Sequence, residues 1–313
     1  PLNALNSFDE FYRLYIQELD WIIEANITVV NDFEAHLASI NPANVFSPTI
    51  PNSLRTGRDA FDDGCDYNNS SLLTTGFGSA IDALSVIEEL VYKKGEISLE
   101  KMAAALNANW EGYEELHRKI LTFRKRYGNG IPEVDRFAQM LSRTLGNRIN
   151  GRPNSRGGVW ESSVHCAKQF IHQGAKTGAT PDGRFAGEEM SKNASPAMGA
   201  DVNGVTALLR SALAIDAASF PGDFPLDVMM HPSSVKGTDG LAAWRQLLRV
   251  YFAGNGVAIH FNIFDAAKLK EAQKNPEKYS GLQIRVCGWN VRFTEMAKSE
   301  QDMYIRRAES IIE

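Results

Sequence analysis

The chain has 313 residues, of which 43% are apolar and 23% are charged, an ordinary composition for a globular protein with a sizeable buried core. This composition excludes a disordered polypeptide, a collagen-like fibre and a disulfide-stapled miniprotein. The formal net charge is −5 and the Lys and Arg residues are scattered, so the sequence offers no basic stripe to nucleic acid or to an anionic membrane surface.

No targeting or membrane segment is predicted. No apolar run is long enough to span a membrane, and the polar segment after Pro1 lacks the leader of a secreted protein. The absence of an initiator Met leaves open that the chain is a piece of a longer product. The three cysteines, Cys65, Cys166 and Cys287, are far apart with no C-x-x-C pair, which favours reduced thiols in the cytoplasm over disulfides or a structural zinc site.

Helical periodicity dominates residues 1–150, which we assign to a helical domain. Apolar residues recur at three- and four-residue steps across the first forty residues and predict one long amphipathic helix. A Pro- and Asn-rich break at 41–53 and a Gly-rich loop at 64–78 follow, and helical periodicity resumes at 82–94, 98–110 and 111–126. Another helix is predicted after Pro132, a residue suited to the first turn of a helix.

Residues 151–313 form a second predicted domain, in which strands and helices alternate. The stretch from Thr177 to Gly204 has almost no apolar periodicity, and a loop of that length inside a compact domain is usually functional or mobile. Strands are then predicted at 226–230, 257–264 and 282–286, with helices between and after them. This alternation predicts an α/β fold with parallel strands.

The common catalytic motifs are absent. The sequence has no G-x-S-x-G elbow, Walker loop, G-x-G-x-x-G or H-E-x-x-H pattern, and no histidine spacing that supports a local metal site. His165 beside Cys166 resembles a base and its nucleophile, but neighbours in a strand point to opposite faces, so a structural role is favoured. On the strand 257–264, His260 and Asn262 share one face, and we favour hydrogen bonds to neighbouring groups over a substrate-facing role.

Two segments of the sequence indicate the protein family most strongly. Residues 285–293, RVCGWNVRF, resemble the radical-bearing loop of the glycyl radical enzymes, the pyruvate formate-lyase family. Residues 177–184, TGATPDGR, match a loop of that family letter for letter. Further matches follow at the family's intervals, at Ser195-Pro196, Gly199-Ala200-Asp201, Gly237–Leu241, Asn275–Tyr279 and Glu300-Gln301-Asp302.

The resemblance implies part of a ten-stranded α/β barrel. Residues 1–150 would be the helical C-terminal end of the pyruvate formate-lyase-like domain, and residues 151–313 would hold half-barrel strands and the C-terminal radical loop at 285–293. It also implies that Gly288 stores a radical installed by a radical-SAM activating enzyme, with no bound cofactor and no metal. Glycine suits this role because a Cα radical is stabilised by both flanking amides at a planar centre, which a Cβ would crowd. We expect the loop to be buried, since water, oxygen and hydrogen donors would destroy the radical. Cys287 and Trp289 replace the Ser or Ala and the Tyr or Phe that are usual in the family.

In the family the glycine passes its radical to a cysteine on a Gly-Cys loop. Gly64-Cys65 imitates that loop, but Asp66-Tyr67-Asn68 match a different, downstream segment. We therefore expect the thiyl cysteine, and the glutamate base that accompanies it, to lie upstream of this chain.

The resemblance implies a radical lyase or dehydratase that cleaves a C–O, C–N or C–C bond of a small polar substrate anaerobically. Formate acetyltransferase is the enzymatic alternative, because Arg292-Phe293 is shared with pyruvate formate-lyase itself. The sequence also leaves open a split subunit that carries only the radical and an α/β scaffold that carries none. The full-length protein is expected to be a homodimer.

Overall fold

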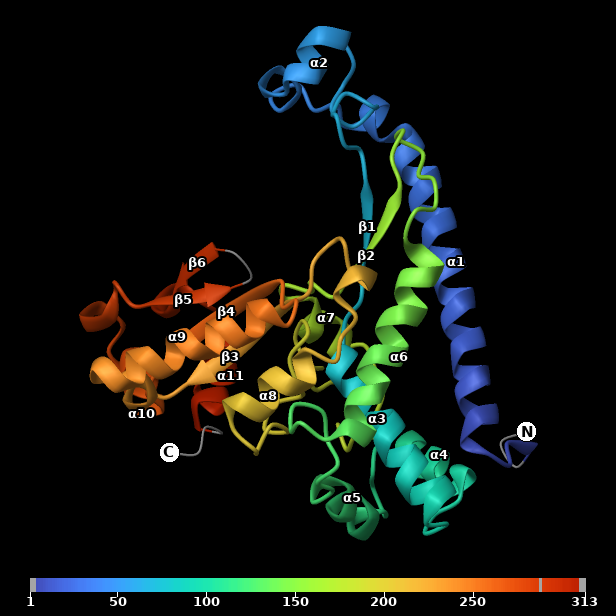
Figure 1. The fold of residues 1–313 in the computed structure, drawn as a ribbon, viewed down its shortest axis with the longest axis vertical. Coiled ribbons are helices and arrows are strands. Elements are labelled where there is room, and N and C mark those ends of the chain that lie inside the picture. The colour runs from blue at the N-terminus through green and yellow to red at the C-terminus, as the bar shows by residue number, and fades with distance from the viewer. Residues whose placement is uncertain (1–3, 287–288, 310–313) are drawn as a thin grey trace. The chain divides into compact units, whose positions relative to one another are not determined.

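The computed structural model describes residues 4–286 and 289–309 (Figure 1). The chain forms two compact units, each built from separate segments. Unit 1 comprises Pro1–Leu73, Leu141–Ser163 and Ala218–Gly222, and unit 2 comprises Thr74–Met140, Val164–Ala217 and Asp223–Glu313. The domain boundary between residues 150 and 151 stays a prediction.

Unit 1 contains the long N-terminal helix that the periodicity predicted, α1 (Phe8–Ile40). Ser7 caps it, because its Oγ accepts a hydrogen bond from the Glu10 amide at 3.2 Å. The Glu10 carboxylate in turn accepts from the Asn6 amide at 2.8 Å, which satisfies a second free donor at this end. The predicted N-terminal helix is therefore confirmed, and the cap formed by Ser7 marks where it begins.

The remainder of unit 1 is a helical turn, a short helix and a parallel strand pair. A 3₁₀ turn at Ser47–Thr49 precedes α2 (Pro51–Thr56), and β1 (Ser70–Leu73) pairs with β2 (Trp160–Ser163) so that Ser70 lies opposite Trp160. The sequence prediction of an uninterrupted loop at 64–78 is wrong at β1. The strand begins with two serines and has only four residues, which is too short to show an apolar alternation.

The first half of unit 2 is helical. It contains α3 (Phe77–Val86), a π-helical continuation at Ile87–Lys93, α4 (Leu99–Asn107), α5 (Glu114–Leu121), the first part of α6 (Pro132–Ile149), α7 (Gln169–Gly174) and α8 (Val205–Ala212). Helix α6 begins at Pro132, as predicted. One core of this half surrounds Met102, Trp110 and Ile120, all of them buried.

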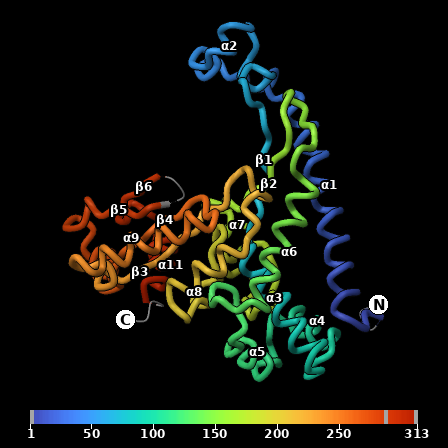
Figure 2. Tube along the Cα trace, in the orientation of Figure 1, coloured from blue at the N-terminus to red at the C-terminus, as the bar shows by residue number. Residues whose placement is uncertain are grey.

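The second half of unit 2 contains a β-α-β element and the C-terminal hairpin. Strands β3 (Pro225–Met230) and β4 (Ala258–Ile263) are parallel and are joined by helix α9 (Gly237–Ala253). Leu226 and Val228 pack in one cluster with residues of α8 and α9. The chain continues through α10 (Ala266–Lys274) and the strands β5 (Gln283–Val286) and β6 (Trp289–Arg292) to α11 (Lys298–Glu309), as the trace in Figure 2 shows.

The predicted helix-rich α/β class with parallel strands is confirmed. The described residues form three two-stranded sheets, two parallel and one antiparallel. The ten-stranded barrel is a prediction about the whole enzyme. In the described part of the chain, no helix combines the length and apolarity needed to cross a bilayer.

Candidate radical site

The hairpin β5–β6 carries the predicted radical position. Its strands are antiparallel, and Val286 lies opposite Trp289, which leaves only two residues to connect them. These two are Cys287 and Gly288, which lie outside the described residues. The structure therefore defines the hairpin through the strands on either side of the predicted radical glycine.

The base of this hairpin is anchored in the core of unit 2. Ile284 and Phe293 are fully buried and share a cluster with Tyr304 of α11. Gln301 of α11 donates from Nε2 to the carbonyl oxygens of Phe293 and Met296, at 3.0 Å each. Gln301 belongs to a segment that matched the family by sequence, and the structure shows that it fixes the turn after β6.

The outer side of the hairpin is exposed. Arg285 and Asn290 lie opposite each other and are joined by a hydrogen bond of 3.2 Å between Nη1 and Oδ1, and both are exposed. Trp289 is 47% exposed although it lies on the opposite face, the one that carries Ile284 and Val291. The packing of this hairpin on the core is therefore confined to its base, around Ile284 and Phe293. The expected burial of the radical loop concerns the whole enzyme and stays a prediction.

Arg184 organises the TGATPDGR loop. Its guanidinium donates to the carbonyl oxygens of Gly174, Thr177, Gly178 and Glu188, and its Nε donates to Thr180 Oγ1 at 3.1 Å. The other side of the loop is held by Trp110, whose Nε1 donates to the Arg184 carbonyl, and by His117, whose Nε2 lies 2.7 Å from the Gly183 carbonyl. The loop that the sequence suggested was functional or mobile is thus tightly hydrogen-bonded.

Two glycines of this region provide a matched pair of substitutions. A Cβ on Gly174 would lie 2.3 Å from the Glu188 carbonyl oxygen, whereas a Cβ on Gly178 would meet nothing within 4 Å. We expect Gly174→Ala to lower the free energy of unfolding by about 1–3 kcal/mol, because the backbone must move to relieve the overlap. Gly178→Ala should change it by less than about 0.5 kcal/mol. Urea unfolding of both variants checks this, and equal effects would contradict the described packing.

A cavity of about 800 Å³ in unit 2 is lined by two of the family-matched segments, the TGATPDGR loop and Gly199-Ala200-Asp201. Asp182 and Arg184 come from the first loop, and Gly199 and Ala200 come from the second. Arg126 also lines the cavity, but its Nη2 donates to the carbonyl oxygens of Ile120 and Asp182, at 2.7 and 2.9 Å. The guanidinium groups of Arg126 and Arg184 therefore build the wall of the cavity.

Asp82 is a buried carboxylate beside this wall. Its Oδ1 accepts from the Tyr127 amide at 2.7 Å, and its Oδ2 lies 3.5 Å from Arg126 Nη1. Burial raises the pKa of Asp82 to about 7, against the opposing effects of Arg126 and the Tyr127 amide. Between about pH 4 and pH 7, the Asp82 carboxyl is therefore protonated in the folded protein but ionised in the unfolded chain.

This raised pKa predicts a pH dependence of stability. The contribution of protonated Asp82 is complete below about pH 4 and is lost as the pH rises towards 7, by roughly 1 kcal/mol per pH unit. We expect Asp82→Asn to remove this slope, so that the wild type loses stability relative to the variant between pH 4.5 and 7. Denaturant unfolding at several pH values measures the difference, and parallel curves would contradict the assigned pKa.

The polar face of the β3–β4 pair holds a buried charge cluster. Asp227 Oδ1 lies 2.9 Å from Lys192 Nζ, and Asp227 Oδ2 accepts from Asn193 Nδ2 at 2.6 Å. His260 is the register partner of Asp227 on β4, and its Nδ1 lies 3.7 Å from Asp227 Oδ1. Burial raises the pKa of Asp227, but Lys192 and His260 outweigh it and hold the pKa well below its usual range. His260 thus faces Asp227 across the strand pair, but its Nδ1 and the Asn262 Oδ1 have no hydrogen-bond partner among the described residues, so the hydrogen bonds that the sequence favoured are not observed at these atoms. The Lys192–Asp227 pair was not predicted.

His165 and Cys166 contact different residues in the structure. Cys166 is fully buried, and its Sγ accepts a hydrogen bond from the Asn193 amide at 3.1 Å. His165 Nδ1 instead lies 3.4 Å from Asp223 Oδ2. The structural role favoured from the sequence stays a prediction.

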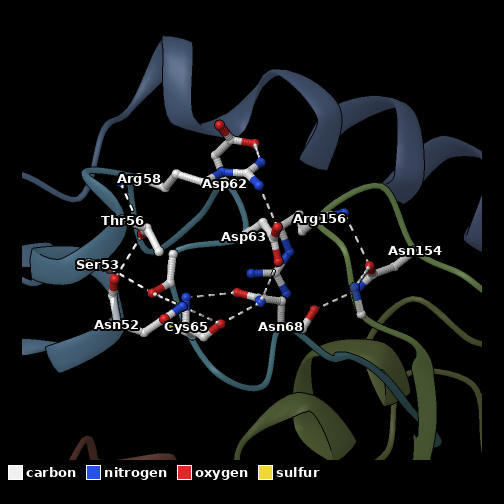
Figure 3. A network of polar contacts seen from close by, with 12 residues as sticks. Asn52, Ser53, Thr56, Arg58, Asp62, Asp63, Cys65, Asn68, Asn154 and Arg156 are labelled. Carbon is white, nitrogen blue, oxygen red and sulfur yellow. Dashed lines mark hydrogen bonds and ion pairs between the residues drawn. The ribbon is translucent and has the colours of Figure 1, made fainter.

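Cys65 lies in a local polar network of unit 1 (Figure 3). Its amide donates to Asn68 Oδ1 at 3.2 Å, and Asn68 Nδ2 donates back to the Cys65 carbonyl at 2.8 Å and to Asp63 Oδ1 at 3.1 Å. Ser53 Oγ donates to the Gly64 carbonyl at 2.9 Å. These contacts give Asn68 a loop-closing role.

In the described part of the chain, no three His, Cys, Asp or Glu side chains are grouped to hold a metal ion.

Comparison with known proteins identifies the family. Residues 1–171 match the family described as Pyruvate formate lyase-like, and residues 190–294 match the one described as Glycine radical. The chain is 31% identical over 303 residues to trans-4-hydroxy-L-proline dehydratase of Clostridioides difficile, covering 97% of this chain and 38% of that protein.

Solved structures agree with this match. A structure described for 1,2-propanediol dehydration in Roseburia inulinivorans superposes with a TM-score of 0.91 at 32% identity, covering 96% of this chain and 39% of that one. The glycerol-bound B12-independent glycerol dehydratase from Clostridium butyricum gives a TM-score of 0.92 at 30% identity, with 98% and 39% covered.

The chain belongs to the pyruvate formate lyase-like family, the glycyl radical enzymes. The resemblance stated from the sequence is thereby confirmed. The chain spans 38–39% of the length of these relatives.

Proposed function

We propose that this chain is the C-terminal part of a glycyl radical dehydratase, with the radical stored on Gly288. The match to the glycine radical family carries the proposal, because the matched residues 190–294 include Gly288. Three relatives of at least 30% identity are described as acting in dehydration, which favours C–O cleavage over C–N and C–C cleavage.

The proposed reaction needs no bound cofactor, because the radical is part of the protein. The Gly288 Cα radical takes a hydrogen atom from a cysteine thiol, leaving Cα–H and a thiyl radical. The thiyl takes a hydrogen atom from a substrate carbon that carries a hydroxyl or amine. The glutamate base takes the proton of that hydroxyl or amine, and the hydroxyl of the adjacent carbon accepts a proton and leaves as water. The product radical recovers the hydrogen atom from the cysteine. The sum is substrate to product plus water, with the radical restored.

In this scheme the residues of the chain hold the hairpin in place. Ile284 and Phe293 fix its base by burial, and Gln301 fixes the turn that follows. The cysteine that carries the thiyl and its glutamate base are proposed to lie in the remainder of the enzyme, outside this chain. A radical-SAM activating enzyme is the proposed partner, and the whole enzyme is proposed to be a cytoplasmic homodimer with a small hydroxylated substrate.

Anaerobic turnover tests the proposed reaction. The protein made from its complete reading frame is activated with a radical-SAM activating enzyme and supplied separately with glycerol, 1,2-propanediol and trans-4-hydroxy-L-proline. We expect one hydroxylated substrate to be converted to its dehydrated product. Formation of formate and acetyl-CoA from pyruvate and CoA, without any dehydration, would contradict the proposal and favour formate acetyltransferase.

A further inference from the structure

Helix α1 has two apolar faces, and only one of them is buried. On the inner face Ile23 and Ile27 are buried, and Glu24 forms an ion pair with Arg152. On the other face six large apolar side chains are 40–69% exposed: Leu14, Trp21, Ile22, Val29, Phe33 and Ile40. We name these six the outer stripe of α1, the long blue helix in Figure 1.

The outer stripe runs along one side of α1. At 100° per residue its six side chains occupy about a third of the circumference of the helix, and they extend over roughly 40 Å of its length. Scattered single apolar residues are normal on a protein surface, but an apolar patch of several hundred Å² marks an interaction site. The outer stripe therefore predicts that another segment packs along α1.

The charges on this face define the kind of segment that fits. Glu18 and Asp32 lie among the residues of the outer stripe and form no ion pair within the described residues. Three other acids of α1, Asp20, Glu24 and Glu34, are already paired with arginines outside the helix, so Glu18 and Asp32 carry the acidic charge of this face. An apolar helix with Lys or Arg along its edges complements this surface.

The same charges disfavour two of the arrangements in which a second copy of the chain could be the occupant. In an antiparallel pair of α1 helices centred on Ala25, Glu18 of one copy faces Asp32 of the other, because the two residues are equidistant from Ala25. In a parallel pair each acid faces itself. Both arrangements place like charges together at an apolar interface, where their repulsion is strongest.

We propose that the outer stripe is the docking surface for a basic-edged amphipathic helix from the remainder of the same enzyme. The chain covers only 38–39% of the length of its relatives, so most of such an enzyme must pack against the part present here. The proposal rests on family membership and on α1, and it does not depend on the radical chemistry.

Covalent footprinting with photogenerated carbenes tests this. The 313-residue chain and the product of the complete reading frame are labelled in parallel and analysed by mass spectrometry. We expect labelling of Trp21 and Phe33 to fall at least fivefold in the complete product. Trp160, which is 2% exposed, should be weakly labelled in both samples and serves as the control.

A charge-reversed variant of the complete product sharpens the test. Glu18→Lys with Asp32→Lys should restore labelling of Trp21 severalfold, whereas Glu18→Asp with Asp32→Glu should keep it low. Equal labelling of the chain and the complete product would overturn the proposal. Protection that arises from dimerisation of the 313-residue chain, or a reading frame that adds no residues, would overturn it as well. The labelling of Trp21 and Phe33 does not require a radical. Failure of the proposed dehydratase function would therefore leave the labelling result unchanged, and the two failures can be told apart.

Discussion

Replacement of Gly288 by alanine is expected to abolish both the radical and turnover. A glycyl Cα radical keeps one α-hydrogen, so its unpaired electron couples to that proton and gives a doublet in the electron paramagnetic resonance spectrum. In the Gly288→Ala variant the added Cβ crowds the planar geometry that both flanking amides need. After activation the variant should show no doublet, and its activity should fall by about a thousandfold or more, because the reacting group itself is lost.

Cys287→Ser provides the matched control for this result. Serine is usual before the glycine in the family, and it removes a thiol that could donate hydrogen to the neighbouring radical. We expect this variant to keep the doublet and to hold it at least as long as the wild type. A doublet in Gly288→Ala, or its loss in Cys287→Ser, would contradict the assignment of the radical to Gly288.

Replacement of Asp227 by asparagine is expected to cause the largest loss of stability. Asp227 and Lys192 are 4% and 3% exposed, and the ion pair between them spans 2.9 Å. Removal of the carboxylate charge breaks the buried ion pair to the Lys192 ammonium, and breaking such a pair from one side costs about 3–5 kcal/mol. Denaturant unfolding at pH 7 measures the loss. Because the pKa of Asp227 is lowered, its contribution is present above about pH 4 and fades only as the pH falls towards the folded-state pKa.

A double variant separates the charge from the shape of this site. Lys192→Met combined with Asp227→Asn removes both charges and keeps an apolar chain of similar length. We expect it to recover most of the stability that Asp227→Asn loses, since a buried pair replaced as a whole is often neutral. No recovery, or a single variant within about 1 kcal/mol of the wild type, would show that the charge pair is unimportant.

The long helices were predictable from the sequence because their signals are local. The apolar periodicity of α1 and the first-turn proline of α6 lie within the elements they define. The strand β6 was not predicted, because Trp289–Arg292 has only four residues and its outer side chains are exposed. Short elements of this kind depend on the strand opposite them, and single-sequence patterns do not show that partner.

The burial of residues within the 177–204 segment could not be predicted from apolar periodicity either. Ser191, Lys192, Asn193 and Ser195 are all at most 3% exposed, although they are polar. Ser191 and Ser79 exchange hydrogen bonds of 3.0 Å, each donating its amide to the hydroxyl of the other. Such polar burial is stable only because the partners come from distant parts of the sequence. The TGATPDGR motif showed from the sequence that this segment matters, but its hydrogen-bond partners are seen only in the structure.

The family itself was readable from the sequence because its motifs are specific at fixed intervals. The TGATPDGR loop and the RVCGWNVRF segment stand about a hundred residues apart, and the comparisons confirmed the family they suggested. Arg285, Trp289 and Asn290 are exposed in this chain. The expected burial of the radical loop concerns the whole enzyme and stays a prediction, because the chain spans only 38–39% of the length of its relatives.

The most direct test of the central claim is the mass of the activated protein after exposure to air. Oxygen adds to a glycyl Cα radical and cuts the backbone there. We predict release of a C-terminal fragment that begins at about Gly288, with no cut in Gly288→Ala. An uncut chain, under activation that leads to cleavage of a known glycyl radical enzyme, would contradict a radical at Gly288.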